Sequence, residues 1–548
     1  GWVWWRVKKW AVKLFDRLAT QWGQPELVEE APVKALAITF NKVVAPAACS
    51  ALVGELHGHM GTAADAAGLR KYMSRKVLFY GLHLLQSCLD FASAWKAVLK
   101  VELEFLLGVA FEQFRMTAAE LETIEHDPFE YMRINATDAF DTSSPRASAR
   151  LLFWAALEVR KAATAPVLTN MLATGLAACP PGGGDPLYKE ALLYLVQELH
   201  EWLATDKVQK GRLEGLLEGH VTPEFASPHA FLRARAIAVW ARYCDIRFRR
   251  KDLLMTAVRH VYDCLSDSAL VVKLTAGSSL GAFLARSKSA RKAMEPAVMD
   301  ILKALFRMLD DLGTDEVVRT VGVMCEAYYK LLPHIARDLL SQLVKLWVES
   351  LPAPDANPLD IDDENALLGD GLLSTVQVIL FQLMQSDHCD VIVANTDIMF
   401  ELIASLFQKE GPTLEYVDSG FDIFSDMLVA MEGRVAEMGA MWDLYARMID
   451  FYSTSAADCT EIMLTPVDCL CAYAPDRFTA EKDPTTGLDN VHLLLHAMRT
   501  AEEKGDDHER GWMIRMWLTV LHNCRGKVDR ALPDLLATYA PLAATSHL

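Results

Sequence analysis

The sequence predicts an all-α protein, a long superhelix of antiparallel helix pairs stacked side by side as a solenoid. The first observation is that one sequence pattern occurs twice, at residues 231–240 and 271–283. Both segments place apolar residues at helical spacing, with a basic residue near the helix start. The second is the regular spacing of similar segments. The third is that 548 residues with 52% hydrophobic content show no composition break into compact domains, and a stacked array provides a core of that length.

Five basic residues mark the repeated segments, at intervals of 56, 44, 40 and 46 residues: Arg133, Lys189, Arg233, Lys273 and Arg319. Three intervals lie near the roughly 40–47 residues of HEAT or armadillo units, and the long one contains the Pro/Gly-rich residues 180–184. A unit of this size cannot bury its own apolar face, so it must stack on copies of itself. We therefore expect a HEAT-repeat α-solenoid.

The first half of the chain is a succession of predicted helices. The first covers residues 2–22 and is amphipathic. Four residues are expected to share one face of it: Trp5, Trp10, Leu14 and Leu18. Further helices are predicted at residues 32–53, 69–95, 98–115, 147–178 and 187–217, with a loop at 58–68. Asp127 before Pro128 supplies an N-cap and a first-turn proline, so another helix should begin there.

The second half continues in helix pairs. They are predicted at residues 231–309, 317–332 with 335–351, and from 372 to the end, with a loop at 480–488. The expected organisation is HEAT repeats in residues 1–179, 180–350 and 372–548, separated by an acidic mobile loop at 351–371. That loop contains three prolines and six acidic residues, too little apolar surface to fold.

The net charge of −18 is concentrated in one region. Between residues 351 and 460 twenty acidic residues face three basic ones, so the rest of the chain is almost neutral. This acidity argues against direct binding of nucleic acid and for basic protein partners. The apolar stretch at 77–95 contains His83, Gln86 and Asp90, so it fails as a membrane span, and no membrane partner is expected.

Seven acidic residues are candidates for binding a basic partner protein: Asp360, Asp362, Asp363, Glu364, Asp418, Asp422 and Asp426. The last three stand at i, i+4 and i+8, where mutual repulsion along one helix face costs stability. A charge arrangement that costs stability calls for an explanation, and a basic partner supplies one. The alternative is a solvated face with a solubilising loop.

Another seven residues are interpreted as structural, within or between repeats: Asp127, Glu130, Arg133, Arg233, Arg235, Lys273 and Arg319. Glu130 and Arg133 are spaced for an i,i+3 helix pair. Arg233 and Arg235 either contact a partner protein or pair with acidic residues of the adjacent unit, and the ladder of contacts between stacked units favours the second interpretation. The tryptophans near the start are read mainly as core, with exposed anchors for a partner as the alternative.

No constellation of catalytic residues is found, so we expect no enzyme, cofactor or metal site. His492 and His496 are one turn apart but lack a third ligand at useful spacing. Cys469 and Cys471 lack a second cysteine pair and are read as packed thiols. Eleven cysteines without framework spacing indicate reduced thiols in the cytosol or nucleus.

Four motifs carry a family resemblance: Trp4-Trp5-Arg6-Val7-Lys8-Lys9-Trp10-Ala11, Asp127-Pro-Phe-Glu-Tyr-Met-Arg133, Phe231-Leu-Arg-Ala-Arg-Ala236 followed by Tyr243-Cys-Asp-Ile-Arg-Phe248, and Leu414-Glu-Tyr416. Their order and approximate separations resemble the importin seven/eight branch of the importin-β (karyopherin-β) family. The resemblance covers nearly the whole chain and is patchy around residues 46–68 and 480–508.

The resemblance implies a nuclear transport receptor that binds basic cargo such as ribosomal proteins or histones. Such receptors pass the nuclear pore by contacting Phe-Gly nucleoporins, release cargo when Ran-GTP binds, and move between cytoplasm and nucleus. It also implies that the chain is a central piece, without the N-terminal repeats that hold the main Ran site. The alternative is a HEAT-repeat scaffold or regulatory subunit without a transport role.

Overall fold

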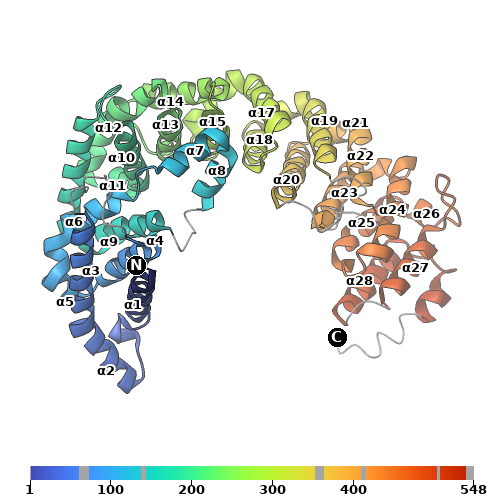
Figure 1. Ribbon diagram of the computed structural model, residues 1–548. Helices are drawn as coiled ribbons and strands as arrows, with labels where there is room; N and C mark the ends of the chain where they lie inside the picture. Colours follow the sequence, from blue (N-terminus) through green and yellow to red (C-terminus); the bar gives the residue numbers. More distant parts are fainter. Residues whose placement is uncertain are drawn as a thin grey trace. The chain divides into compact units, whose positions relative to one another are not determined.

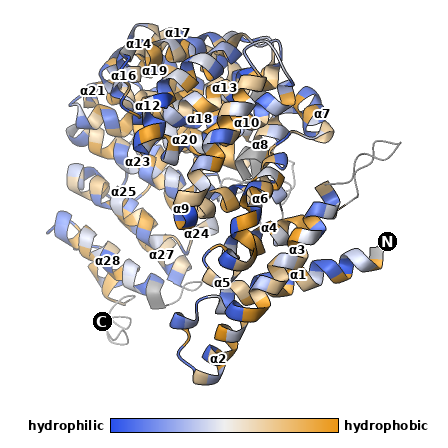
Figure 2. Cartoon of the chain, turned by 90° about the vertical axis from the view of Figure 1, so that its left-hand side faces the viewer, coloured by the Kyte–Doolittle hydropathy of each residue, from blue (hydrophilic) through white to orange (hydrophobic). Residues whose placement is uncertain are grey.

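The computed structural model describes residues 2–60, 73–137, 144–351, 363–408, 415–502 and 507–537, and in these ranges the chain is built from helices with no strand. It divides into two compact units, residues 1–290 and 291–548. Bands of hydrophobic and hydrophilic residues alternate along the helices, as expected of amphipathic elements packed in layers (Figure 2). The all-α prediction is confirmed, and the organisation into three repeat blocks stays a prediction.

Unit 1 contains fifteen α-helices within its described residues. They are α1 (Trp2–Trp22), α2 (Ala31–Thr39), α3 (Ala45–Met60), α4 (Arg75–Cys88), α5 (Ala92–Ala94), α6 (Lys100–Glu112), α7 (Ala118–His126), α8 (Pro128–Thr137), α9 (Pro145–Ala178), α10 (Pro186–Glu198), α11 (His200–Thr205), α12 (Lys207–Leu216), α13 (Ala230–Tyr243), α14 (Lys251–Asp263) and α15 (Leu270–Arg286). Short turns η5 (Thr222–Ala226) and η6 (Cys264–Ser266) lead into α13 and α15. Helix α4 packs between α1 and α9, and α13 packs between α10 and α15 (Figure 1).

Unit 2 follows α16 (Lys288–Met294), which crosses the boundary between the units. Its helices are α17 (Val298–Leu312), α18 (Asp315–Ala327), α19 (Leu332–Ser350), α20 (Asp363–Gln385), α21 (Cys389–Ala394), α22 (Thr396–Leu406), α23 (Val417–Met431), α24 (Gly439–Ser455), α25 (Thr460–Tyr473), α26 (Pro475–Phe478), α27 (Asn490–Glu502) and α28 (Asp507–Asn523).

Unit 2 is arranged in two layers. Helices α17, α19, α22, α24 and α27 pack in succession and form the first layer, while α18, α20, α23, α25 and α28 form the second. The core lies between the layers, where the indole rings of Trp347 and Trp442 are fully buried. Each helix is thus covered by its neighbours in the row and by the facing layer, the arrangement that a helix pair without its own core requires.

Several helices begin where the sequence predicts. The Asp127 carboxylate accepts a hydrogen bond from the Glu130 N–H at 3.0 Å, and Pro128 opens α8. Helix α7 was not anticipated, although its capping box is readable: the Thr117 hydroxyl and the Glu120 carboxylate satisfy each other's backbone N–H groups at 3.2 and 2.6 Å.

The segment α9 spans 34 residues and consists of two helices that meet at a kink at Arg160, where φ is −128° and ψ is 35°. Pro166 lies one and a half turns later and cannot donate to the carbonyl four residues before it. The Thr164 hydroxyl donates to the carbonyls of Ala156 and Arg160, at 2.8 and 3.0 Å. Of the two alternatives predicted for residues 147–178, one helix or a helix pair, the structure shows the pair, joined at a kink.

The predicted face of the first helix is wrong. Trp10 and Leu14 are 60% and 57% exposed, whereas Trp5 lines the side that faces α3 and α4. Trp5 and Trp10 are five residues apart, so they point in directions about 140° apart around the helix axis. The face toward α3 and α4 is instead spaced as i, i+7 and i+10, from Trp5 through Val12 to Phe15.

The predicted loop at residues 351–371 is too long, because α20 begins at Asp363. Leu368 and Leu372 lie one turn apart and are buried, and this burial supports the helix further toward the N-terminus than its acidic composition suggested. Residues 352–362 lie outside the described residues. The predicted loop at 58–68 is likewise helical up to Met60, and the rest of it lies outside the described ranges.

Two helical stretches among the described residues, 31–60 and 366–385, are long and apolar enough to cross a membrane by length and composition alone. The second belongs to α20, which packs against α18, α19 and α23, and half of its most apolar window is buried. Its hydropathy is that of a helix covered on several sides by others. One third of the window in the first stretch is buried.

Candidate binding surfaces

An acidic stripe runs along α23 and consists of Asp418, Asp422 and Asp426. Asp418 and Asp422 are exposed, while Asp426 is half-buried beside α25. Burial and the Asp418 charge raise the pKa of Asp422, and burial together with the Asp422 charge raises the pKa of Asp426 to about 6. Among the described residues none of the three has an ion-pair partner. The i, i+4, i+8 spacing thus places three mutually repelling carboxylates in a row, as predicted.

The other four acidic candidates lie near the start of α20. Asp360 and Asp362 are outside the described residues. Asp363 and Glu364 form the first turn of α20, and their side chains are not among those described. Their role in binding cargo stays a prediction.

A ladder of ion pairs, called here the repeat ladder, links successive helix pairs in unit 1. Arg233 on α13 donates two hydrogen bonds of 2.8 Å to the Asp267 carboxylate, which precedes α15 and also accepts from the Ala269 N–H at 2.8 Å. Burial alone would raise the pKa of Asp267, but these bonds lower it overall. One carboxylate therefore holds the neighbouring unit and caps the start of the next helix.

The ladder continues toward the N-terminus. Lys189 on α10 is buried, donates to the Cys179 carbonyl at 2.8 Å and lies 3.5 Å from the Glu224 carboxylate in η5. Burial lowers the pKa of Lys189, and Glu224 acts against that shift. Arg235 donates to Glu190 at 2.7 Å and to Gln197 at 2.8 Å, and its guanidinium stacks over a tyrosine ring of α10. These contacts are the structural pairings that the ladder reading anticipates.

Two marker residues do not bridge units. Arg319 pairs with Asp315 of its own helix at 2.9 Å, and the structure shows no ion pair for Lys273 among the described residues. The Lys273 charge nevertheless helps to lower the pKa of Asp267, and the structural role expected of these two residues stays a prediction.

Helix α8 lies against α15, and the Thr275 hydroxyl is 3.6 Å from the Met132 sulfur (Figure 1). Arg133 donates to Glu130 at 2.7 and 2.8 Å, the i,i+3 pair predicted. Burial raises the pKa of the Tyr131 hydroxyl, and the charges of Arg235 and Glu190 act on it. The motif at residues 127–133 therefore sits on the repeat ladder.

A slot opens between α17 and α19, adjacent members of the first layer. It has a volume of about 310 Å³, and its apolar lining is formed by Leu302, Phe306, Ile335 and Leu339, with Met299 41% exposed. Four charged side chains also line it: Lys303, Arg307, Asp310 and Asp338. The Gln342 side chain closes one end by donating to Asp310 at 3.0 Å. No pattern in the sequence marks such a slot, because its width depends on how far apart two helices settle.

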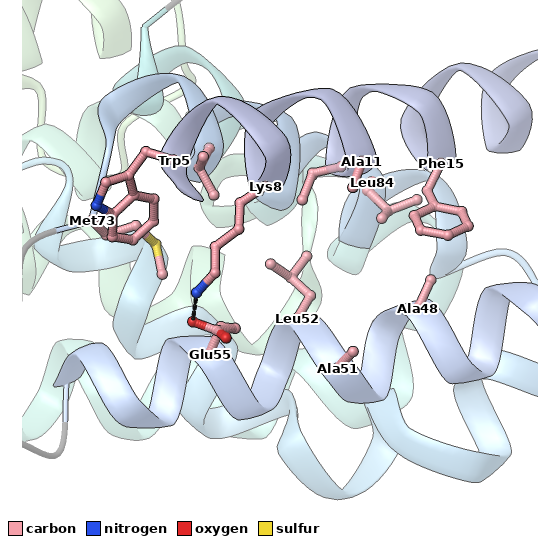
Figure 3. A pocket seen from close by; sticks show the side chains of 12 residues that line it. Trp5, Lys8, Ala11, Phe15, Ala48, Ala51, Leu52, Glu55, Met73 and Leu84 are labelled. Atoms are coloured by element: carbon pink, nitrogen blue, oxygen red, sulfur yellow. Dashed lines mark hydrogen bonds and ion pairs between the residues drawn. The ribbon is translucent and has the colours of Figure 1, made fainter. Parts of the chain in front are cut away.

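A second apolar cavity of about 170 Å³ lies among α1, α3 and α4. Figure 3 shows Trp5 and Met73 at one end, Phe15 and Ala48 at the other, and the ion pair from Lys8 to Glu55 across it at 2.7 Å. Trp4 and Trp10 lie outside this cavity and are 71% and 60% exposed. The expectation that most of these tryptophans are core is therefore wrong for Trp4 and Trp10.

The remaining sequence candidates are structural. Cys471 of α25 lies beside Cys524, and burial raises its pKa well above the ordinary value. His492 lies 3.2 Å from Asp489, while His496 is exposed. Within the described residues no group of three or more His, Cys, Asp or Glu side chains is placed to hold a metal ion.

Comparison with known proteins gives the following relatives. No protein-family model matches the chain. It is 24% identical to importin-8 of Mus musculus over 97% of this chain and 50% of that protein, and 22% identical to an importin beta-like SAD2 homolog of Arabidopsis thaliana over the same shares. The solved structure of Lph2, described as a bidirectional nuclear transport receptor of S. cerevisiae, is similar with a TM-score of 0.66 at 15% identity, covering 97% of this chain and 53% of that one.

These findings confirm two predictions. The similarity to importin-8 confirms the resemblance to the importin seven/eight branch of the importin-β family, and the Lph2 structure confirms the helical solenoid fold. The chain spans about half the length of these relatives.

Proposed function

We propose that this chain is part of a nuclear transport receptor that binds basic cargo proteins, such as ribosomal proteins or histones, and carries them between cytoplasm and nucleus. The similarity to importins over 97% of the chain supports the receptor class. The acidic stripe on α23 is the observation from which we infer that the cargo is basic. Its carboxylates repel one another and have no basic partner among the described residues, so a lysine- or arginine-rich protein relieves the repulsion when it binds.

Electrostatic attraction explains how such a surface works. Three carboxylates in a row attract a basic protein from a distance and speed its docking, and the effect weakens as salt screens the charges. Acidic residues at the start of α20 extend the negative region in the sequence. Cargo release then needs a competing event, and binding of Ran-GTP to the whole receptor is the one that the resemblance implies.

Passage through the nuclear pore requires weak contacts with Phe-Gly repeats of nucleoporins. The slot between α17 and α19 suits a phenylalanine ring, because apolar side chains from two adjacent helices of one layer, among them Phe306 and Leu339, line it together with charged ones. A shallow slot of this kind gives contacts that form and break quickly. We assign the slot as one Phe-Gly site. A receptor with such a site is expected at the nuclear pore, in the nucleus and in the cytoplasm.

The cargo proposal is tested by binding of a basic ribosomal protein to the chain at increasing salt. Neutralising the acidic stripe (Asp418→Asn, Asp422→Asn, Asp426→Asn) should weaken binding roughly tenfold at low salt and flatten its salt dependence. A matched control neutralises three exposed carboxylates elsewhere in unit 2, Glu401→Gln, Glu437→Gln and Asp443→Asn. Equal loss in both variants would show that only net charge matters and would remove the stripe from the proposal.

The transport role is separated from the scaffold alternative by pull-downs with Ran-GTP and with a Phe-Gly repeat peptide. A full-length receptor that contains this chain should capture both, and Met299→Glu at the edge of the slot should weaken capture of the Phe-Gly peptide alone. A full-length protein that ignores both would be a scaffold without a transport role.

A further inference from the structure

A groove separates α18 from α20 in the second layer, although the two helices pack closely at its base. They approach because two glycines lack side chains: a Cβ on Gly322 would lie 3.2 Å from the Thr375 hydroxyl, and one on Gly371 would lie 3.4 Å from Val318. Above this contact the helices leave a cavity of about 330 Å³. The groove, called here the α18–α20 groove, is therefore built into the packing of two adjacent helices.

The chemistry of the groove is apolar at its base and acidic at its rim. Val323 and Val378 line it beside the two glycines, and three carboxylates surround it, those of Asp315, Glu326 and Asp370. One guanidinium, Arg319, is also present, but it is bound to Asp315 at 2.9 Å. Glu326 and Asp370 are exposed and have no ion pair among the described residues. The groove thus offers two available carboxylates over an apolar floor.

Two apolar side chains extend the surface along α20. Leu367 lines the groove and is 58% exposed, and Phe381 on the same helix is 52% exposed. Leu367, Ser374, Val378 and Phe381 follow one another at i, i+7, i+11 and i+14, which places them on one stripe of the helix. A ligand that fits this stripe carries apolar groups next to its charge.

We propose that the α18–α20 groove binds a segment of a basic protein in which lysine side chains alternate with apolar ones. A lysine stem would lie over Gly322 and Val378, and its ammonium would reach Glu326 or Asp370 at the rim, as long basic side chains do on apolar surfaces. The inference rests on the proposed function and names a cargo subsite distinct from the acidic stripe. An anionic ligand fits less well, because Arg319 is neutralised by Asp315.

The test measures binding of a short fluorescein-labelled peptide of alternating lysine, leucine and glycine by anisotropy, at physiological ionic strength. The variant Glu326→Gln with Asp370→Asn should raise Kd roughly five- to tenfold. The control variant Glu401→Gln with Asp443→Asn removes the same charges from exposed sites on α22 and α24, and should change Kd less than about twofold. Ser374→Lys places an amine at the groove and should weaken binding as strongly as the double neutralisation.

The outcomes separate this inference from the cargo proposal. If the chain binds a basic ribosomal protein but not the peptide, or if the groove and control variants bind the peptide equally, the groove assignment fails and the cargo proposal stands. If the chain binds neither the ribosomal protein nor the peptide, both the cargo proposal and the groove assignment are overturned. A phosphoserine peptide that binds more tightly than the lysine peptide would assign the groove to Arg319 and an anion instead. Far-ultraviolet circular dichroism and thermal unfolding of each variant verify that the fold is retained.

Discussion

The repeat ladder of unit 1 and the acidic stripe of unit 2 hold their charged residues in opposite ways. In unit 1, Arg233 and Arg235 are held by carboxylates of neighbouring helix pairs, at 2.8 and 2.7 Å. In unit 2, the acidic stripe on α23 has no cation beside it in the described part of the chain. Paired charges within a row of helices fix how successive units stack. Unpaired charges of one sign contribute nothing to stacking, so they are available to a partner of the opposite sign.

The largest effect on stability is expected from substitution of Arg235, a member of the repeat ladder. Its replacement by alanine leaves Glu190 buried without a cation, and the Oε2 atom of Glu190 already has no hydrogen-bond partner among the described residues. We expect the free energy of unfolding to fall by about 3–5 kcal/mol, measured by urea unfolding followed by circular dichroism. The double variant Arg235→Met with Glu190→Gln should recover most of the loss. A loss below about 1 kcal/mol would mean that the ladder does not stabilise the stacking.

Replacement of Asp426 is expected to raise the free energy of unfolding, by less than Arg235→Ala lowers it. Its pKa in the folded protein, about 6, lies above the ordinary 3.8, so the folded state favours the protonated carboxyl. The stability contribution of this group therefore improves as pH falls from about 7 toward 4, and Asp426→Asn should be more stable than the parent by about 1 kcal/mol above pH 7. The advantage should shrink toward pH 4. Asp443→Asn, at an exposed site on α24, is the control, and a pH-independent difference for Asp426→Asn would contradict the prediction.

The same titration affects binding. Protonation of Asp426 removes one negative charge from the stripe, so affinity for a basic protein should decrease as pH falls through about 6.

The smallest effect is expected at Arg319. Its side chain is 72% exposed and, among the described residues, pairs with Asp315 of the same helix. Arg319→Ala should change the free energy of unfolding by less than about 0.5 kcal/mol in the same urea experiment. A loss comparable with that of Arg235→Ala would show that Arg319 contributes to stacking after all, and would extend the ladder into unit 2.

Much of the fold was readable from the sequence because helix periodicity and capping are local. The start of α8 at Asp127 was predicted correctly because it depends on residues within a few positions. Lys189 and Arg233 were identified as structural because similar segments recur at intervals along the chain. Helix α7 was missed although Thr117 and Glu120 form a readable capping box. The face of α1 was misjudged because Trp5 and Trp10 were treated as neighbours on the helix surface.

The binding surfaces were less accessible to sequence analysis. The acidic stripe was found because its three residues share one helix face. The α18–α20 groove was not, since it depends on Gly322 meeting Thr375, two residues more than fifty positions apart. The slot between α17 and α19 likewise depends on how two helices pack. Cavities arise from the distance between helices, and a single sequence does not report that distance.

The break in α9 has a consequence for how unit 1 deforms. The Arg160 guanidinium donates to the Leu89 and Asp90 carbonyls at 2.9 and 3.3 Å, and stacks on the Trp95 ring. The residue at which α9 bends is therefore fastened to the turn that follows α4. Bending of α9 at this point is thereby coupled to the turn after α4 through the Arg160 side chain, in addition to the packing of α4 on α9.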